Sequence, residues 1–142
     1  MKRLTGIVAL GILLGGCSDR FDPYHENPDT GRWFSPAQVA EGEALFARYC
    51  AQCHGDRAQA TPGWTQPDAE GLYPPPPLNG TAHAWHHPYP VLEEIILNGS
   101  RGRMPAWKGT LDKPQVASVI AWFQSLWPEQ GYRIWQQRHR SN

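Results

Sequence analysis

Apolar residues recur at helical spacing in three separate stretches of the chain. The first stretch follows Ser35, which with Gln38 three residues later forms the pattern of an N-terminal capping box. Pro36 occupies the first helical position, where proline is tolerated best. The apolar positions after it are Val39, Gly42, Leu45, Phe46 and Tyr49. The pattern therefore predicts a helix that runs from Pro36 up to Cys50.

Two more helices are predicted in the second half of the chain. Pro90 opens a short one that ends at Asn98-Gly99. A second capping box, Asp112 with Gln115, opens the last long helix, and Trp127-Pro128 stops it. The apolar stripes of the two helices comprise Leu92, Ile95 and Ile96, then Val116, Val119, Ile120 and Phe123, with Trp122 and Leu126 beside them.

The remaining segments are read from composition. Residues 55–80 are rich in proline and glycine and include four consecutive prolines, which excludes helix and central strand. Residues 129–142 form a tail in which Tyr132 and Trp135 are expected to dock one or two amphipathic turns. The sequence predicts an all-α domain over 35–128.

A different pattern precedes this domain. A basic start and an apolar run over 7–14, too short to span a bilayer, read as an export signal. Leu14-Gly15-Gly16-Cys17 resembles a bacterial lipobox, in which the cysteine is lipidated and becomes the mature N-terminus. An uncleaved anchor, or cleavage by the ordinary signal peptidase, is the alternative. We therefore predict a signal peptide over 1–16 and a lipid anchor on Cys17.

Residues 17–34 are acidic, contain several turn-forming residues and have few aliphatics, so they are predicted to be a tether between lipid and domain. The whole chain of 142 residues has 13 basic and 13 acidic residues and no net charge. No basic footprint for nucleic acid is present, and such a partner is not expected.

Cys50-Ala51-Gln52-Cys53-His54 is the motif that carries chemistry. C-x-x-C-H is the attachment pattern of a c-type haem: two thiols bond the two vinyl groups, and the histidine binds the iron from the same side. Because the motif occurs once, one haem is expected.

The C-x-x-C pair has three alternative interpretations. A redox dithiol of the thioredoxin type needs a βαβ context, which the pattern lacks. A zinc site needs further ligands, for which His83 and His87 are candidates. A disulfide between Cys50 and Cys53 would leave His54 unexplained.

Met104 is the candidate for the sixth iron ligand. Lipoprotein processing would remove Met1, so Met104 would be the only methionine left, in a glycine-rich loop fifty residues after His54. The alternatives are a core methionine, or a histidine in its place. His83, His86 and His87 are the histidines in question, and together they are a candidate copper site. The other interpretation is that each forms hydrogen bonds to haem propionates or to the backbone, or is simply exposed.

The stretch from Ser35 to about Trp127 resembles a class I c-type cytochrome. Gly42 and Phe46 match the positions at which the N-terminal helix of that family crosses the C-terminal helix. Trp122 matches the aromatic residue of the second helix. The resemblance implies an all-α fold of three main helices around one covalently bound haem.

The resemblance also implies roles for two loops. Residues 76–80 resemble the segment whose proline carbonyl, here assigned to Pro76, accepts a hydrogen bond from the ligand histidine. Residues 102–105 resemble the sixth-ligand loop, which gives Met104 its role. Leu78 and Trp85 are further candidate haem-binding residues, the latter as a donor to a propionate.

The expected function is one-electron transfer by a lipid-anchored protein that faces the periplasm, with redox proteins as donor and acceptor. Both axial positions are filled and no catalytic acid or base is needed, so an electron carrier is expected rather than an enzyme. Positive charges near the ligand loop either steer an acidic partner or are ordinary surface. They are Arg101, Arg103, Lys108 and Lys113. A haem sensor or peroxidase with a labile sixth ligand, and a histidine-based metal carrier, are the alternatives.

Overall fold

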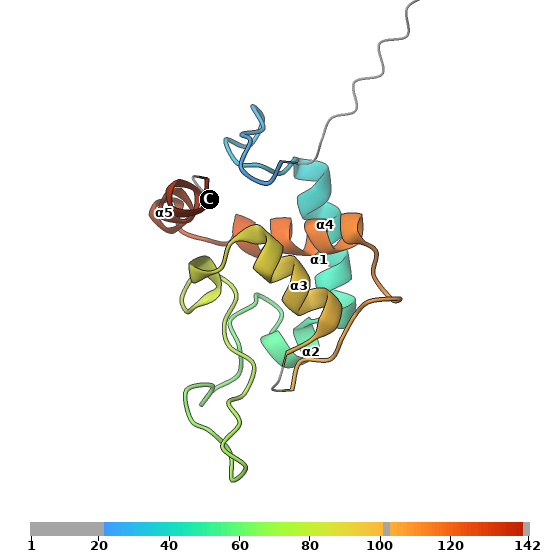
Figure 1. Cartoon of the computed structure of the whole chain (residues 1–142), viewed down its shortest axis with the longest axis vertical. Coiled ribbons are helices and arrows are strands. Elements are labelled where there is room, and N and C mark those ends of the chain that lie inside the picture. The colour runs from blue at the N-terminus through green and yellow to red at the C-terminus, as the bar shows by residue number, and fades with distance from the viewer. Residues whose placement is uncertain (1–21, 101–102, 141–142) are drawn as a thin grey trace, which may run out of the picture.

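The computed structural model describes residues 22–100 and 103–140, and these ranges contain helices and loops but no β-strand (Figure 1). The helices are α1 (Pro36–Tyr49), α2 (Ala51–His54), the 3₁₀-helix η1 (Ala84–His86), α3 (Tyr89–Asn98), α4 (Lys113–Ser125) and α5 (Glu129–His139). The all-α prediction is confirmed. The predicted signal peptide and Cys17 lie outside the described residues.

Both predicted capping boxes are present. At the start of α1, the Gln38 N–H donates to Ser35 Oγ at 3.2 Å, and the Ser35 N–H donates to Gln38 Oε1 at 2.9 Å. At the start of α4, Asp112 and Gln115 exchange the same two bonds at 2.8 and 3.0 Å. Each box satisfies two backbone N–H groups that a helix start leaves without a partner, so the starts are fixed locally.

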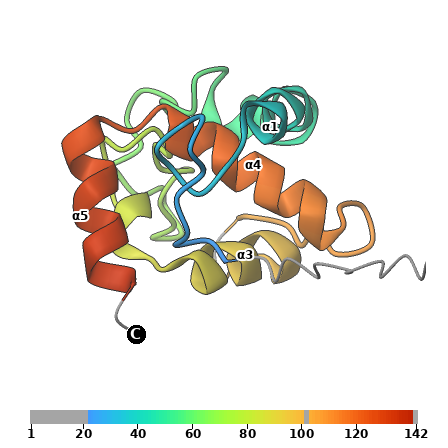
Figure 2. The same cartoon turned by 90° about the horizontal axis from the view of Figure 1, so that it is seen from above.

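Helices α1 and α4 cross at Gly42, as the resemblance implied. Figure 2 shows α1 nearly end-on where it meets α4. A β-carbon on Gly42 would overlap the carbonyl oxygen of Ser118 and lie 2.8 Å from Trp122 Cβ. One turn along, the rings of Phe46 and Trp122 stack with centroids 4.3 Å apart. Only glycine permits this separation of the two backbones.

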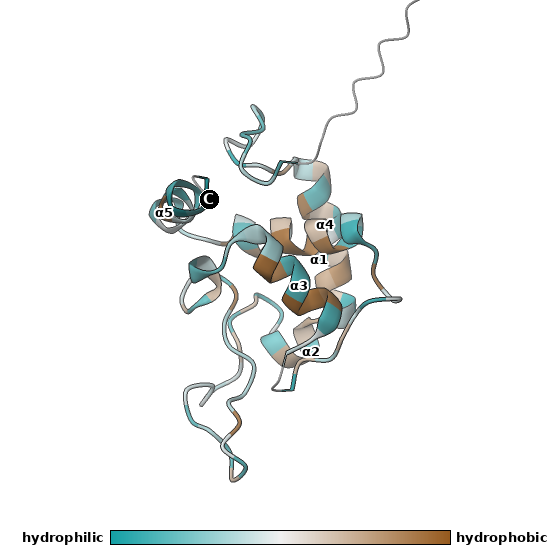
Figure 3. Cartoon of the chain, in the orientation of Figure 1, coloured by the Kyte–Doolittle hydropathy of each residue, from teal (hydrophilic) through white to brown (hydrophobic). Residues whose placement is uncertain are grey.

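Helix α4 is the centre of the core. Every residue from 116 to 124 is buried, because α1, α3 and the segments described below cover it from several sides. Figure 3 shows the most hydrophobic positions of α1, α3 and α4 gathered at their meeting point. Helix α3 buries Tyr89, Leu92 and Ile96 there, whereas Ile95 of the predicted stripe is only partly buried.

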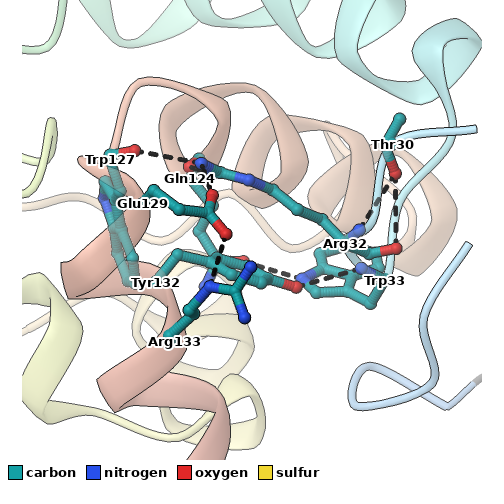
Figure 4. Close-up of polar contacts among 8 residues, drawn as sticks. All are labelled: Thr30, Arg32, Trp33, Gln124, Trp127, Glu129, Tyr132 and Arg133. Carbon is teal, nitrogen blue, oxygen red and sulfur yellow. Dashed lines mark hydrogen bonds and ion pairs between the residues drawn. The ribbon is translucent and has the colours of Figure 1, made fainter.

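Residues 22–34, here called the strap, are packed against the helices instead of forming a free tether. Trp33 and Phe34 are 6% and 2% exposed. The guanidinium of Arg32 donates to the carbonyl oxygens of Gln124 at 2.6 Å and Trp127 at 3.1 Å, at the C-terminal end of α4 (Figure 4). A cation is stabilising at a helix C-terminus, where carbonyl groups lack partners. The described part of the predicted tether therefore belongs to the folded domain.

The strap also meets α5, which is longer than the predicted one or two turns. The Trp33 N–H donates to the hydroxyl oxygen of Tyr132 at 3.0 Å, and Arg32 lies 4.5 Å above the Tyr132 ring. Tyr132 and Trp135 dock as predicted, both almost fully buried. Helix α5 has eleven residues, and together with the strap it covers the end of α4. None of the helices in the described ranges combines the length and apolar composition that a bilayer crossing requires.

The crossing at Gly42 leads to a prediction about stability. Gly42→Ala should lower the free energy of unfolding by about 1–3 kcal/mol, because one methyl group must push two helix backbones apart. The matched control is Gly131→Ala in α5, where an added β-carbon meets nothing within 4 Å. There alanine should be neutral or raise stability by up to about 1 kcal/mol. Denaturant unfolding of the two variants measures both effects, and equal effects would contradict the crossing.

Candidate functional site

The two thiols and the histidine of the motif are presented by one short turn. Cys50 caps α1, with its N–H bonded to the carbonyl of Phe46 at 2.8 Å. In α2, the N–H groups of Cys53 and His54 both point to the carbonyl of Cys50, at 3.1 and 2.9 Å. Cys50 is half-buried, Cys53 is exposed and neither forms a disulfide. Helix α1 therefore leads the chain directly into the motif.

His54 is buried, and one ring nitrogen is already engaged. Its Nδ1 lies 3.0 Å from the carbonyl oxygen of Pro76, as the resemblance implied. A carbonyl oxygen only accepts, so Nδ1 carries the proton and Nε2 keeps a free lone pair. Burial lowers the pKa of His54, and the bond to Pro76 offsets this in part. The ring is thus held neutral and oriented, which is the form that binds a metal.

Cys50 is unlike the reactive cysteine of a redox dithiol. Burial, with a smaller contribution from Cys53, raises the pKa of the Cys50 thiol to about 11. Dithiol oxidoreductases instead depend on a cysteine whose pKa is lowered, because the thiolate is the reactive form. The two thiols of the motif and one oriented imidazole are the groups that hold a c-type haem.

Residues 76–80 are held in place by bonds from two sides. The Leu78 N–H donates to the carbonyl of Ala58 at 2.8 Å, and the Trp127 indole N–H donates to the Leu78 carbonyl at 2.7 Å. Gly80 lies against the ring of Trp127, so close that a β-carbon there would be 3.1 Å from Cδ1. Because Leu78 is two residues after Pro76, these contacts also fix the carbonyl that orients His54.

Met104 is half-buried and packs against the hydrophobic core. Its carbonyl oxygen accepts the Ser100 N–H at 3.2 Å, and the loop beyond it is fixed by the bond from the Trp107 N–H to the Ile96 carbonyl at 3.1 Å. Gly99 has φ +77°, and a β-carbon on it would lie 2.7 Å from the Met104 carbonyl oxygen. Glycine at this position lets the loop fold back on α3.

The remaining candidates lie near α5. The carbonyl of His87 accepts the Trp135 indole N–H at 2.8 Å, and the Arg138 guanidinium lies 5.8 Å from the Trp85 ring centroid. Trp85 is therefore engaged by α5, and its bond to a propionate stays a prediction. In the ranges that the structure describes, no three His, Cys, Asp or Glu side chains are grouped to hold a metal ion, which gives the zinc and copper alternatives no site there.

Comparison with known proteins agrees with this donor set. The model of the family "Cytochrome C oxidase, cbb3-type, subunit III" matches residues 37–123. Cytochrome c-551 of Bacillus subtilis is 32% identical over 114 residues, which cover 80% of this chain and 85% of that protein. The chain belongs to the class I c-type cytochromes. One haem c is bound covalently through Cys50 and Cys53.

Other relatives are longer than this cytochrome. The cbb3-type cytochrome c oxidase subunit CcoP of an Azospirillum species is 31% identical over 125 residues, which are 86% of this chain and 40% of that subunit. Subunit FixP of a Bradyrhizobium species is 36% identical over 89 residues, which are 62% of this chain and 27% of that subunit. The solved structure of cytochrome CL from Methylophaga aminisulfidivorans aligns with a TM-score of 0.49 at 25% identity, covering 72% of this chain and 59% of that chain.

Sequence reasoning missed two residues that hold the segment 76–80 in place. Trp127 was read only as the stop of α4, and Ala58 was not singled out, although its carbonyl accepts from both Leu78 and Asn79. Ala58 has φ +53°, an unusual value for alanine, and is fully buried. Neither role leaves a local pattern in the sequence, because the Trp127 indole and the Ala58 carbonyl meet their partners only in the folded chain.

The support of the cytochrome's histidine by Trp127 can be tested against a matched bond elsewhere. Trp127→Phe and Trp135→Phe each remove one indole bond to a backbone carbonyl, and each should lower the free energy of unfolding by about 1–3 kcal/mol. Only Trp127→Phe should also speed exchange of the His54 Nδ1 proton, followed by NMR in the reduced protein. If both variants leave that exchange unchanged, Trp127 does not position Pro76.

Proposed function

We propose that this cytochrome carries single electrons at a bacterial membrane, with His54 and Met104 as the two axial ligands of its haem. The observation that supports this most directly is the buried His54 ring, whose Nδ1 is bonded to Pro76 and whose Nε2 is left for iron. Met104 fits the sixth position, because it lies half-buried in a loop whose backbone is fixed on both sides.

The two ligands adjust the iron in opposite directions. The haem supplies a one-electron Fe(III)/Fe(II) couple when it is bound. The thioether of Met104 is a soft donor that favours the reduced state, and the Pro76 carbonyl makes the His54 imidazole more basic, which favours the oxidised state. If His54 and Met104 both bind the iron, neither axial position would be left for a substrate.

A lipid anchor on Cys17 would hold the domain at the membrane surface, facing the periplasm. The strap begins a few residues after that cysteine, so the anchor would be attached close to a packed segment. Several acyl chains give durable binding where one does not. Relatives named as subunits of cbb3-type oxidases support a redox complex as the partner, with this cytochrome as its electron donor or acceptor.

The axial ligation is tested with variants of Met104. The oxidised wild type should show the weak far-red charge-transfer band that methionine sulfur gives on ferric haem, and Met104→Ala should abolish it and let CO bind the ferrous form. Met104→His should lower the reduction potential by a few tenths of a volt, on the order of the changes that axial ligands produce.

The control is a variant with His83, His86 and His87 all replaced by alanine, which should keep the band and the potential. If the wild type lacks the band, and Met104→Ala leaves the spectrum and potential unchanged while the triple variant alters them, a histidine is the sixth ligand. Rapid CO binding by the wild type would favour the sensor or peroxidase alternative instead.

The anchor is tested independently of the haem. Cys17→Ser should move the protein from the membrane to the soluble fraction, because the acyl chains attach to that sulfur, while the absorption spectrum stays that of the wild type. Cell fractionation followed by haem staining measures both properties. Membrane association that persists in the variant would mean that another segment holds the protein there.

A further inference from the structure

Two loops that flank the haem motif are joined by an ion pair between residues 35 positions apart. Arg103 Nη2 is bonded to Asp68 Oδ2. Asp68 lies in the long loop between α2 and η1, and Arg103 directly precedes Met104 in the loop between α3 and α4. This engages one of the positive charges that the sequence offered for steering a partner. Lys113 is engaged too, by Glu93 of α3, at 2.8 Å.

Backbone hydrogen bonds hold the carboxylate of Asp68 in place independently of Arg103. Its Oδ1 accepts the N–H groups of Glu70 at 3.0 Å and Leu72 at 2.8 Å. The Asp68 N–H donates to the Leu72 carbonyl at 2.9 Å, and the Gly71 N–H donates to the Asp68 carbonyl at 3.0 Å. One carboxylate oxygen is therefore used to close a turn, and the other is left for the guanidinium. The side chain of Asp68 is only 24% exposed, which is low for a surface carboxylate.

Met104 lies between this ion pair and a second attachment. On the α3 side, its carbonyl accepts the Ser100 N–H, and Gly99 allows the backbone at position 99 to lie close to the Met104 carbonyl. On the other side, the neighbouring residue Arg103 is bonded to Asp68. The ion pair thus ties the backbone next to the methionine to a loop that starts at the haem motif itself.

We propose that Asp68 is a positioning residue that, through Arg103, keeps the Met104 loop closed and so lengthens the lifetime of the methionine–iron bond. This rests on the proposed ligation by Met104. The long loop after His54 then has a defined task, because it brings one carboxylate to the residue that precedes Met104. Since Arg103 is 54% exposed, the effect is that of a partly screened ion pair and depends on ionic strength.

The experiment measures CO binding to the reduced protein at saturating CO, where the rate reports how fast Met104 leaves the iron. Asp68→Asn keeps the oxygen that closes the turn and removes the charge. At low salt, Asp68→Asn and Arg103→Gln should each raise this rate about two- to five-fold, which is what an exposed ion pair supplies. The double variant should add nothing to the larger single effect. High salt should bring the wild type toward the variants.

The matched control is Glu70→Gln, in the same turn, because the Glu70 carboxylate forms no ion pair with any described residue. It should leave the rate and its salt dependence unchanged. If Asp68→Asn and Arg103→Gln behave like this control while the wild type shows the sulfur charge-transfer band, the ion pair has no positioning role although Met104 is the ligand. Absence of the band in the wild type would overturn the ligation and, with it, this role of Asp68.

Discussion

The close approach of α1 and α4 at Gly42 is the contact on which the rest of this cytochrome depends. It fixes how α1 lies against α4, and α1 leads directly into Cys50 and the haem motif. It also fixes the direction of α4, whose end carries Trp127. Hydrogen bonds connect Trp127 to His54. The Trp127 indole N–H is bonded to the carbonyl of Leu78, and the carbonyl of Pro76, two residues before Leu78, orients His54. The absence of a side chain at Gly42 is thus linked, through α4 and Trp127, to the orientation of His54.

The haem site is built from segments with very different means of support. The motif lies on a helical turn whose own backbone bonds hold it. The histidine is oriented by a loop that is held by an indole and by the strained backbone at Ala58. The methionine loop is attached to the end of α3 on one side and to the Asp68 turn on the other. His54 is buried, whereas the ion pair beside Met104 is partly exposed, so solvent and salt reach the Met104 loop more readily.

The features that the sequence predicted correctly depend on residues close together in the chain. The capping boxes of α1 and α4, the glycine end of α3 and the spacing of the haem motif each depend on residues within one or two turns, so their patterns could be recognised. Pro76 and Gly42 were assigned through family resemblance, and both are found in the expected contacts. The strap was misread as tether because its few aliphatic residues suggested no burial. It is aromatic residues, Trp33 and Phe34, that bury it, and their partners are about ninety residues away.

That separation has a consequence for the order in which the chain acquires its structure. Arg32 and Trp33 find these partners between residues 124 and 132, so the strap cannot form these contacts until the chain as far as α5 has been synthesised. The haem motif needs only its own turn and the end of α1. During that interval the two thiols lie on a domain whose fold is not yet complete. The contacts between the residues most distant in the sequence therefore form last.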